Sequence, residues 1–261
     1  MFLLKHSFLD RYSDLNSPVH KLDPRARLIA AFAAIFIIVS EPHGRLLPFA
    51  FYGVIILLVT AISRIPPGYI LKRCLAVSPF IIIAAVSFPL SSPGTGEAGT
   101  GLISGEGVRS GLTIFLKGSF ALVLLILLTS TGKFHRLLAG LRKLRMPRLL
   151  GVISALMYRY VFILHDELLR TSRARDSRTP GRIRTKRLRA YGNQAAMIFI
   201  RSIERSHTVY NSMLSRGFTG EFPDMNRLRL RAGDILMAGS FVLLLFAVRI
   251  TSQPLIERFL N

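Results

Sequence analysis

Apolar residues in this 261-residue chain come in blocks, and a long basic stretch separates the last block from the earlier ones. Four early blocks predict membrane-spanning helices at about 25–40, 46–63, 74–90 and 111–130, and a fifth block lies within 231–261. Runs of this length approach the roughly 20 apolar residues that a helix needs to cross a bilayer. The pattern predicts an all-α, polytopic membrane protein with about five transmembrane helices.

The basic stretch is too polar for lipid and too long for a loop. From Lys133 to Arg231 the chain has 22 Lys and Arg against 6 Asp and Glu. Breakers such as Pro147 and Pro180-Gly181 divide it into three predicted helices, at about His135–Arg145, Pro147–Asp176 and Leu188–Arg216. The chain is therefore expected to have three parts: a membrane domain at 1–132, a domain of long helices at 133–230, and a last membrane helix with its tail at 231–261.

The second of these helices raises the question of a sixth span. Its first half, Leu149–Leu164, is apolar on nearly all sides and has Arg159 as its single charge. A lone arginine near the middle of a bilayer costs about 2.5 kcal/mol or more. We expect this half to be buried against other helices at the inner face of the membrane.

The connections between the apolar blocks give the orientation. The segment Arg64–Arg73 has three basic residues and no acid, whereas Ser91–Arg109 has two Glu and one Arg. Loops rich in Lys and Arg stay in the cytoplasm. We therefore expect a protein of the inner (plasma) membrane, with its amino terminus and the 133–230 domain in the cytoplasm and its carboxyl terminus outside. Lys117, near the outer end of the fourth block, is expected to reach toward the membrane surface.

Catalytic and metal-binding residues are not predicted. The single cysteine, Cys74, excludes a disulfide framework or a cysteine metal site, and most of the histidines are scattered without ligand spacing. His165, Asp166 and Glu167 are consecutive, so a helix points them in different directions. No cofactor is expected on these grounds.

The high positive charge leaves two other functions open. One is an integral-membrane enzyme acting on lipid or phosphate. The other is a membrane protein whose basic run, Arg182–Arg189, binds lipid headgroups or nucleic acid at the inner leaflet. That run has no aromatic residues for base stacking, so we expect contact with membrane lipid and not with nucleic acid.

Two of the predicted long helices end in a similar short signature. Ala174-Arg175-Asp176 closes one, and Ser215-Arg216-Gly217 closes the other. An arginine among small residues at a helix end can present its guanidinium beyond the last turn, where it can bind carboxylates of a partner in a bidentate manner. A simpler interpretation is a favourable charge at the negative end of the helix dipole. The recurrence of the arginine signature on two helices favours docking to a partner.

The whole chain resembles the transmembrane T component of energy-coupling factor (ECF) transporters, specifically the CbiQ type of cobalt and nickel importers. The resemblance rests on His20-Lys21-Leu22-Asp23-Pro24-Arg25, on the spans followed by a helical domain, and on the two signatures, which match the family's Ala-Arg-Gly motifs. Asp176 replaces the usual glycine of the first motif, and its carboxylate can pair with Arg175 or Arg173. Ser215 replaces alanine in the second motif, which is a small change.

This resemblance implies a function without catalysis by the chain itself. Arg175 and Arg216 would dock into two cytoplasmic ABC ATPases, and the long helices would transmit ATP-driven motion to a metal-binding membrane S component. A small accessory membrane subunit is a further expected partner. The imported ion would be cobalt or nickel, bound by the partner subunit.

Overall fold

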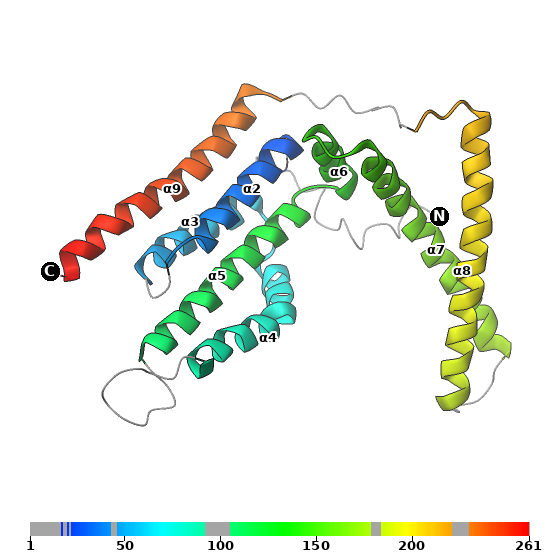
Figure 1. Cartoon of the computed structure of the whole chain (residues 1–261), viewed down its shortest axis with the longest axis horizontal. Helices are drawn as coiled ribbons and strands as arrows, with labels where there is room; N and C mark the ends of the chain where they lie inside the picture. The colour runs from blue at the N-terminus through cyan, green and yellow to red at the C-terminus, as the bar shows by residue number, and fades with distance from the viewer. Residues whose placement is uncertain are drawn as a thin grey trace. The chain divides into compact units, whose positions relative to one another are not determined.

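A computed structural model of the full chain describes residues 22–42, 46–91, 105–178, 184–220 and 230–260, together with Ser17 and His20 (Figure 1). All regular secondary structure in these ranges is helical, which confirms the predicted all-α class. The helices are α2 (Pro24–Val39), α3 (Leu47–Ser63), α4 (Pro67–Ser91), α5 (Gly105–Ser130), α6 (Phe134–Lys143), α7 (Arg148–Arg178), α8 (Arg184–Ser215) and α9 (Ala232–Leu260).

The chain divides into two compact units. The first, which we call the membrane unit, comprises Met1–Leu141 and Arg227–Asn261, and the second, the α7–α8 unit, comprises Arg142–Asn226. The last helix, α9, therefore packs with the amino-terminal helices although the 85 residues of the other unit intervene in the sequence.

By length and composition, four described segments can cross a membrane: Pro67–Ser87, Gly107–Ser130, Arg148–Ser177 and Ala232–Thr251. The apolar helix α3 has 17 residues and α2 has 16, which at 1.5 Å per residue gives about 26 and 24 Å. The hydrocarbon core of a bilayer is about 30 Å thick. The chain is a multi-pass membrane protein, and α2 and α3 are at the short limit for a span.

Helix α2 begins where the sequence predicted. Asp23 caps it by accepting a hydrogen bond from the backbone N–H of Arg25 at 2.9 Å, and Pro24 occupies the first turn, where its missing N–H costs nothing. Helix α4, by contrast, begins at Pro67, seven residues before the predicted span. The basic residues Lys72 and Arg73 are therefore helical, and the Arg73 guanidinium lies 4.7 Å from the centre of the Tyr69 ring.

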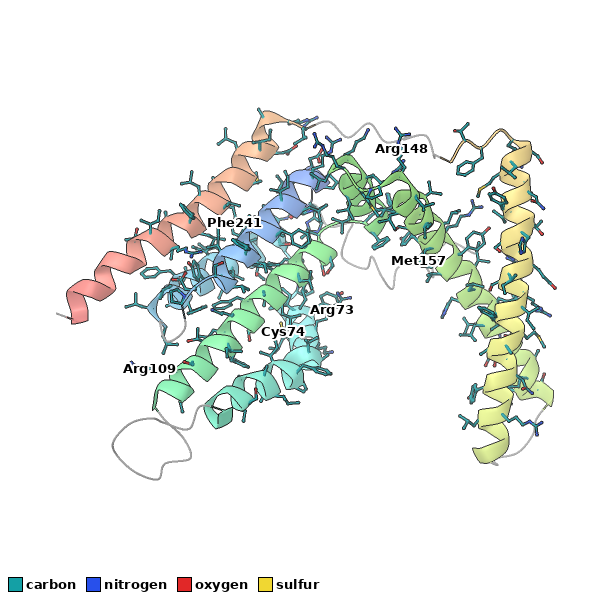
Figure 2. The ribbon with its side chains drawn as sticks, in the orientation of Figure 1. Arg73, Cys74, Arg109, Arg148, Met157 and Phe241 are labelled. Atoms are coloured by element: carbon teal, nitrogen blue, oxygen red, sulfur yellow. The ribbon has the colours of Figure 1, made fainter. Side chains whose placement is uncertain are left out.

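The core of the membrane unit joins helices α2, α3, α5 and α9. Phe241 of α9 packs against this core, and its position is labelled in Figure 2. A second cluster lies between α4 and α5, where the half-buried thiol of Cys74 packs near Ile126 and Leu127. The fully buried members of the main cluster are Ala34, Ile38, Tyr52 and Leu245.

Lys117 is held by a contact within the chain that the sequence did not predict. Its side chain is buried in the membrane unit, and its Nζ donates a hydrogen bond to the backbone carbonyl of Glu41 at 2.5 Å. Carbonyl groups at and just beyond a helix end have no partner inside the helix. The carbonyl that follows α2 therefore offers this ammonium a buried acceptor, which the sequence pattern does not reveal.

The apolar first half of α7 is only partly covered within its own unit. We predicted that it is buried against other helices; Leu149 is 68% exposed and Met157 is 55% exposed, whereas Val152 is buried. The reason is the position of α8, whose polar contacts fall on the second half of α7, between Glu167 and Arg175. The exposed apolar half is what makes α7 long and apolar enough to qualify as a span.

Candidate functional site

The first arginine signature lies within the last turns of α7, where α8 crosses it. Gln194 of α8 contacts both Thr171 and Arg175 of α7, and Arg201 of α8 donates to the Glu167 carboxylate at 2.6 Å. Residue numbers rise along α8 as they fall along α7, so the helices are antiparallel. Arg175 lies three residues before the end of α7 at Arg178.

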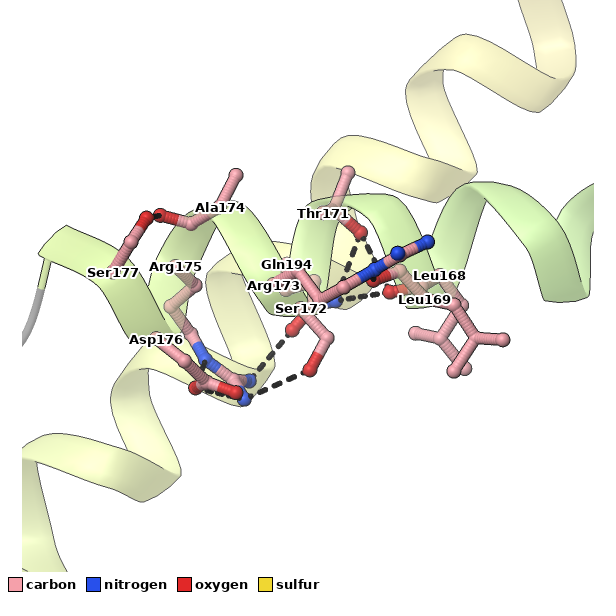
Figure 3. Close-up of polar contacts among 10 residues, drawn as sticks. All are labelled: Leu168, Leu169, Thr171, Ser172, Arg173, Ala174, Arg175, Asp176, Ser177 and Gln194. Atoms are coloured by element: carbon pink, nitrogen blue, oxygen red, sulfur yellow. Dashed lines mark hydrogen bonds and ion pairs between the residues drawn. The ribbon is translucent and has the colours of Figure 1, made fainter.

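The guanidinium of Arg175 is engaged on several sides within the chain (Figure 3). Its Nη1 donates to Gln194 Oε1 at 2.6 Å, and its Nε and Nη2 donate to Asp176 Oδ1 at 3.1 and 2.9 Å. Nη2 also donates to Ser172 Oγ at 3.2 Å, and the cation lies 4.1 Å from the centre of the Tyr191 ring. The Arg175 side chain is only 17% exposed. These contacts direct it along α7 toward α8.

Gln194 is the residue that the sequence analysis missed. It is buried between the two helices, and its Nε2 donates to the Leu168 carbonyl at 3.1 Å and to Thr171 Oγ1 at 2.9 Å. Its Oε1 accepts from Arg175, so its amide is bonded at both ends. No local sequence pattern shows that Gln194 meets residues 19 to 26 positions away.

The second signature has a different geometry. Helix α8 ends in a Schellman motif, because Phe218 N–H donates to the Met213 carbonyl at 3.0 Å and Gly217 N–H donates to the Leu214 carbonyl at 2.9 Å. Gly217 has a φ of 75°, which favours glycine. Arg216 is the cap residue and is exposed, and its guanidinium has no hydrogen bond or ion pair among the described residues.

The two arginines are therefore far apart and unequal. Arg175 lies beside Tyr191 near the start of α8, and Arg216 follows its last residue. The 25 residues between Tyr191 and Arg216 span about 38 Å of helix. The prediction of an unobstructed guanidinium describes Arg216 but is wrong for Arg175. The pairing of Asp176 with Arg175, which the sequence suggested, is present.

Side chains that could bind a metal ion do not cluster in the described ranges. No three His, Cys, Asp or Glu side chains there are placed to hold a metal ion. Within the His165-Asp166-Glu167 group, Glu167 forms an ion pair with Arg201 at 2.6 Å. Most of the basic run Arg182–Arg189, which a lipid or nucleic-acid function would use, lies outside the residues whose side chains are described.

Comparisons with known proteins agree with the architecture. Residues 15–226 match the CbiQ family, described as cobalt transport protein. An uncharacterized protein of Methanocaldococcus jannaschii is 25% identical over 96% of this chain and 86% of its own. The energy-coupling factor transporter transmembrane protein EcfT of Heliobacterium modesticaldum is 29% identical over 67% of this chain and 69% of its own. A fused protein of Methanocorpusculum labreanum, named for cobalt transport, is 29% identical over 78% of this chain, which covers 35% of that longer protein.

Proposed function

The chain belongs to the CbiQ family of cobalt transport proteins, and from that membership we propose that it is the transmembrane coupling component of an energy-coupling factor importer. In this role it hydrolyses nothing itself. Two ABC ATPases bind its cytoplasmic helices, and it passes their motion to a membrane subunit that binds the metal ion. Cobalt is the proposed cargo because the matched family is described by cobalt transport.

The observation that carries the proposal is the position and exposure of Arg216. It stands at the end of a 32-residue helix, it is exposed, and its guanidinium has no hydrogen bond or ion pair in the described part of the chain. A free guanidinium presents a planar fork of N–H donors that matches a carboxylate. A rigid helix behind such a tip can transmit displacement, which a flexible loop cannot.

The separation of the two arginines supports two partner subunits. A distance of about 38 Å along α8 is too long for both tips to enter one small pocket. Each tip can instead engage its own copy of a partner, and relative movement of the two copies would then change how α7 and α8 cross. The second signature is proposed as the anchor, with Ser215 and Gly217 as the small flanking residues. The first signature, Ala174-Arg175-Asp176, is proposed as the other contact.

Co-purification with an ABC ATPase pair tests the proposal. The Arg216→Ala variant is expected to lose most of the bound ATPase, and the double variant Arg175→Ala, Arg216→Ala to lose all of it, because bidentate arginine–carboxylate contacts are removed. The measurement is the amount of ATPase recovered with the tagged, membrane-inserted chain.

Arg205→Ala is the matched control. Arg205 is also exposed on α8, so this change removes the same charge without touching the helix end. Equal losses for Arg205→Ala and Arg216→Ala would mean that general electrostatic attraction holds the complex. Full ATPase recovery with the double variant would refute the proposed docking outright.

A further inference from the structure

Arg175, the arginine of the first signature, already forms hydrogen bonds with other residues of the chain. A guanidinium has five N–H donors, and Arg175 makes four hydrogen bonds to Asp176, Gln194 and Ser172. One face of its plane is also covered by the Tyr191 ring. A carboxylate from a partner that binds in a bidentate manner needs two parallel N–H groups. At least one of the internal bonds must therefore break before such a carboxylate can bind.

Asp176 gives Arg175 a carboxylate, which is the group that the acidic groove of a partner would otherwise provide. Residues i and i+1 on a helix do not normally face each other, yet Asp176 Oδ1 accepts from both Nε and Nη2 of Arg175. The Arg175 side chain lies along α7, where Nη2 also donates to Ser172 Oγ of the preceding turn, so it does not extend beyond the helix end (Figure 3). Asp176 itself is exposed, and it can move away from the guanidinium without leaving a buried charge.

Gln194 links this occupancy to the crossing of the two helices. Its Nε2 bonds to Leu168 and Thr171 hold α8 on α7, and its Oε1 is bonded to Arg175. If Arg175 leaves, the buried Oε1 loses its donor, and an unpaired buried acceptor is unfavourable. Removal of Arg175 by a partner would thus weaken the contact that fixes how α7 and α8 cross.

We infer that Asp176, Gln194 and Tyr191 form an internal clasp that competes with an acidic partner surface for Arg175. Arg216 then serves as the permanent anchor, and the first site engages only when the clasp opens. The inference rests on the proposed docking function. It adds the order in which the two arginines bind their partners. Engagement of the first arginine and loosening of the α7–α8 crossing occur together.

The test isolates the first site by placing every variant in the Arg216→Ala background. The probe is the ATPase pair that co-purifies with the wild-type chain, separated and added back to the full chain in detergent. Asp176→Asn removes the competing charge, and we expect binding to tighten about two- to fivefold, the range for an exposed ion pair. Tyr191→Leu, which keeps every charge, is expected to tighten binding in the same direction.

Glu167→Gln is the matched control, because the Glu167–Arg201 pair joins the same two helices without involving Arg175. Its affinity should equal that of the Arg216→Ala parent. Unchanged or weaker binding in both the Asp176→Asn and Tyr191→Leu variants would overturn the clasp, as would equal tightening by Glu167→Gln. Failure of docking itself would be visible separately, as undiminished binding when Arg175→Ala is added to the Arg216→Ala parent.

Discussion

At the scale of single residues, buried cations in the membrane unit bind backbone carbonyls near helix ends. Arg27 of α2 is buried, and its Nη1 donates to the carbonyl of Thr131, just after α5, at 2.6 Å. Lys117 does the same for the carbonyl of Glu41 after α2. A hydrogen bond to a charged group contributes about 1.5–3 kcal/mol. These basic residues therefore fix helix ends to one another.

Gly132 gives a direct test of the Arg27 contact. A Cβ atom at this position would overlap the Arg27 guanidinium, which is confined by burial and by its bond to Thr131. We expect Gly132→Ala to displace the guanidinium and to lower the free energy of unfolding by about 1–3 kcal/mol. The readout is alkylation of Cys74, the only cysteine, during heating in detergent. Gly68→Ala, which adds a methyl group in open space, should leave the midpoint unchanged.

At the scale of helices, α9 is fixed to the end of α2 by polar contacts as well as by the core. Arg249 Nη2 donates to the Ser40 carbonyl at 3.3 Å, and its Nε lies 3.9 Å from Glu41 Oε2. The Glu41 side chain is 1% exposed. The backbone carbonyl of Glu41 accepts from Lys117 of α5, and its buried carboxylate lies near Arg249 of α9, so Glu41 connects the end of α2 to two other helices.

Neutralising Glu41 should loosen this junction. Glu41→Gln keeps the shape of the side chain and the carbonyl that Lys117 binds, but it leaves Arg249 without its carboxylate partner, and we expect a loss of about 1–3 kcal/mol in unfolding free energy. The double variant Glu41→Gln, Arg249→Met should recover part of the loss, because the cation that lost its partner is also removed. The same Cys74 alkylation assay measures both. Additive effects of the two changes would exclude coupling between the residues.

At the scale of the whole molecule, Lys and Arg are densest in the α7–α8 unit. The α7–α8 unit contains 17 Lys and Arg against 6 Asp and Glu. Lys and Arg residues that lie close to the ends of membrane helices favour retention on the cytoplasmic side during insertion. The exposed apolar half of α7 is compatible with contact to lipid or to another membrane protein.

The topology that follows can be measured by cysteine accessibility in a Cys74→Ala background. A cysteine introduced at Ser212 of α8 should react with a membrane-impermeant maleimide only after the cells are permeabilised, because we place α8 in the cytoplasm. A cysteine in the 92–104 connection should react in intact cells. Labelling of Ser212→Cys in intact cells would place the coupling helices outside and remove the basis for ATPase docking.

Much of the fold could be predicted because its determinants are local. Asp23-Pro24 starts α2, Gly217 ends α8, and blocks of apolar residues give the remaining helices to within several residues. The start of α4 at Pro67 was missed because Lys72 and Arg73 were interpreted as part of a loop. Basic residues in the first turns of a membrane helix can extend their charged groups to the interface, so they do not mark the helix end.

What the sequence alone determined is therefore the set of helices, their membrane character and the two arginines as candidate contacts. These follow from hydrophobic blocks, capping residues and short motifs, which act over one or two helical turns. Only the tertiary structure decided that Lys117 binds the Glu41 carbonyl and that Arg175 is held by α8, whereas the Arg216 guanidinium has no hydrogen bond or ion pair among the described residues. Those outcomes depend on residues that are distant in sequence, Glu41 for Lys117 and Gln194 with Tyr191 for Arg175, and such contacts exist only once the helices have packed.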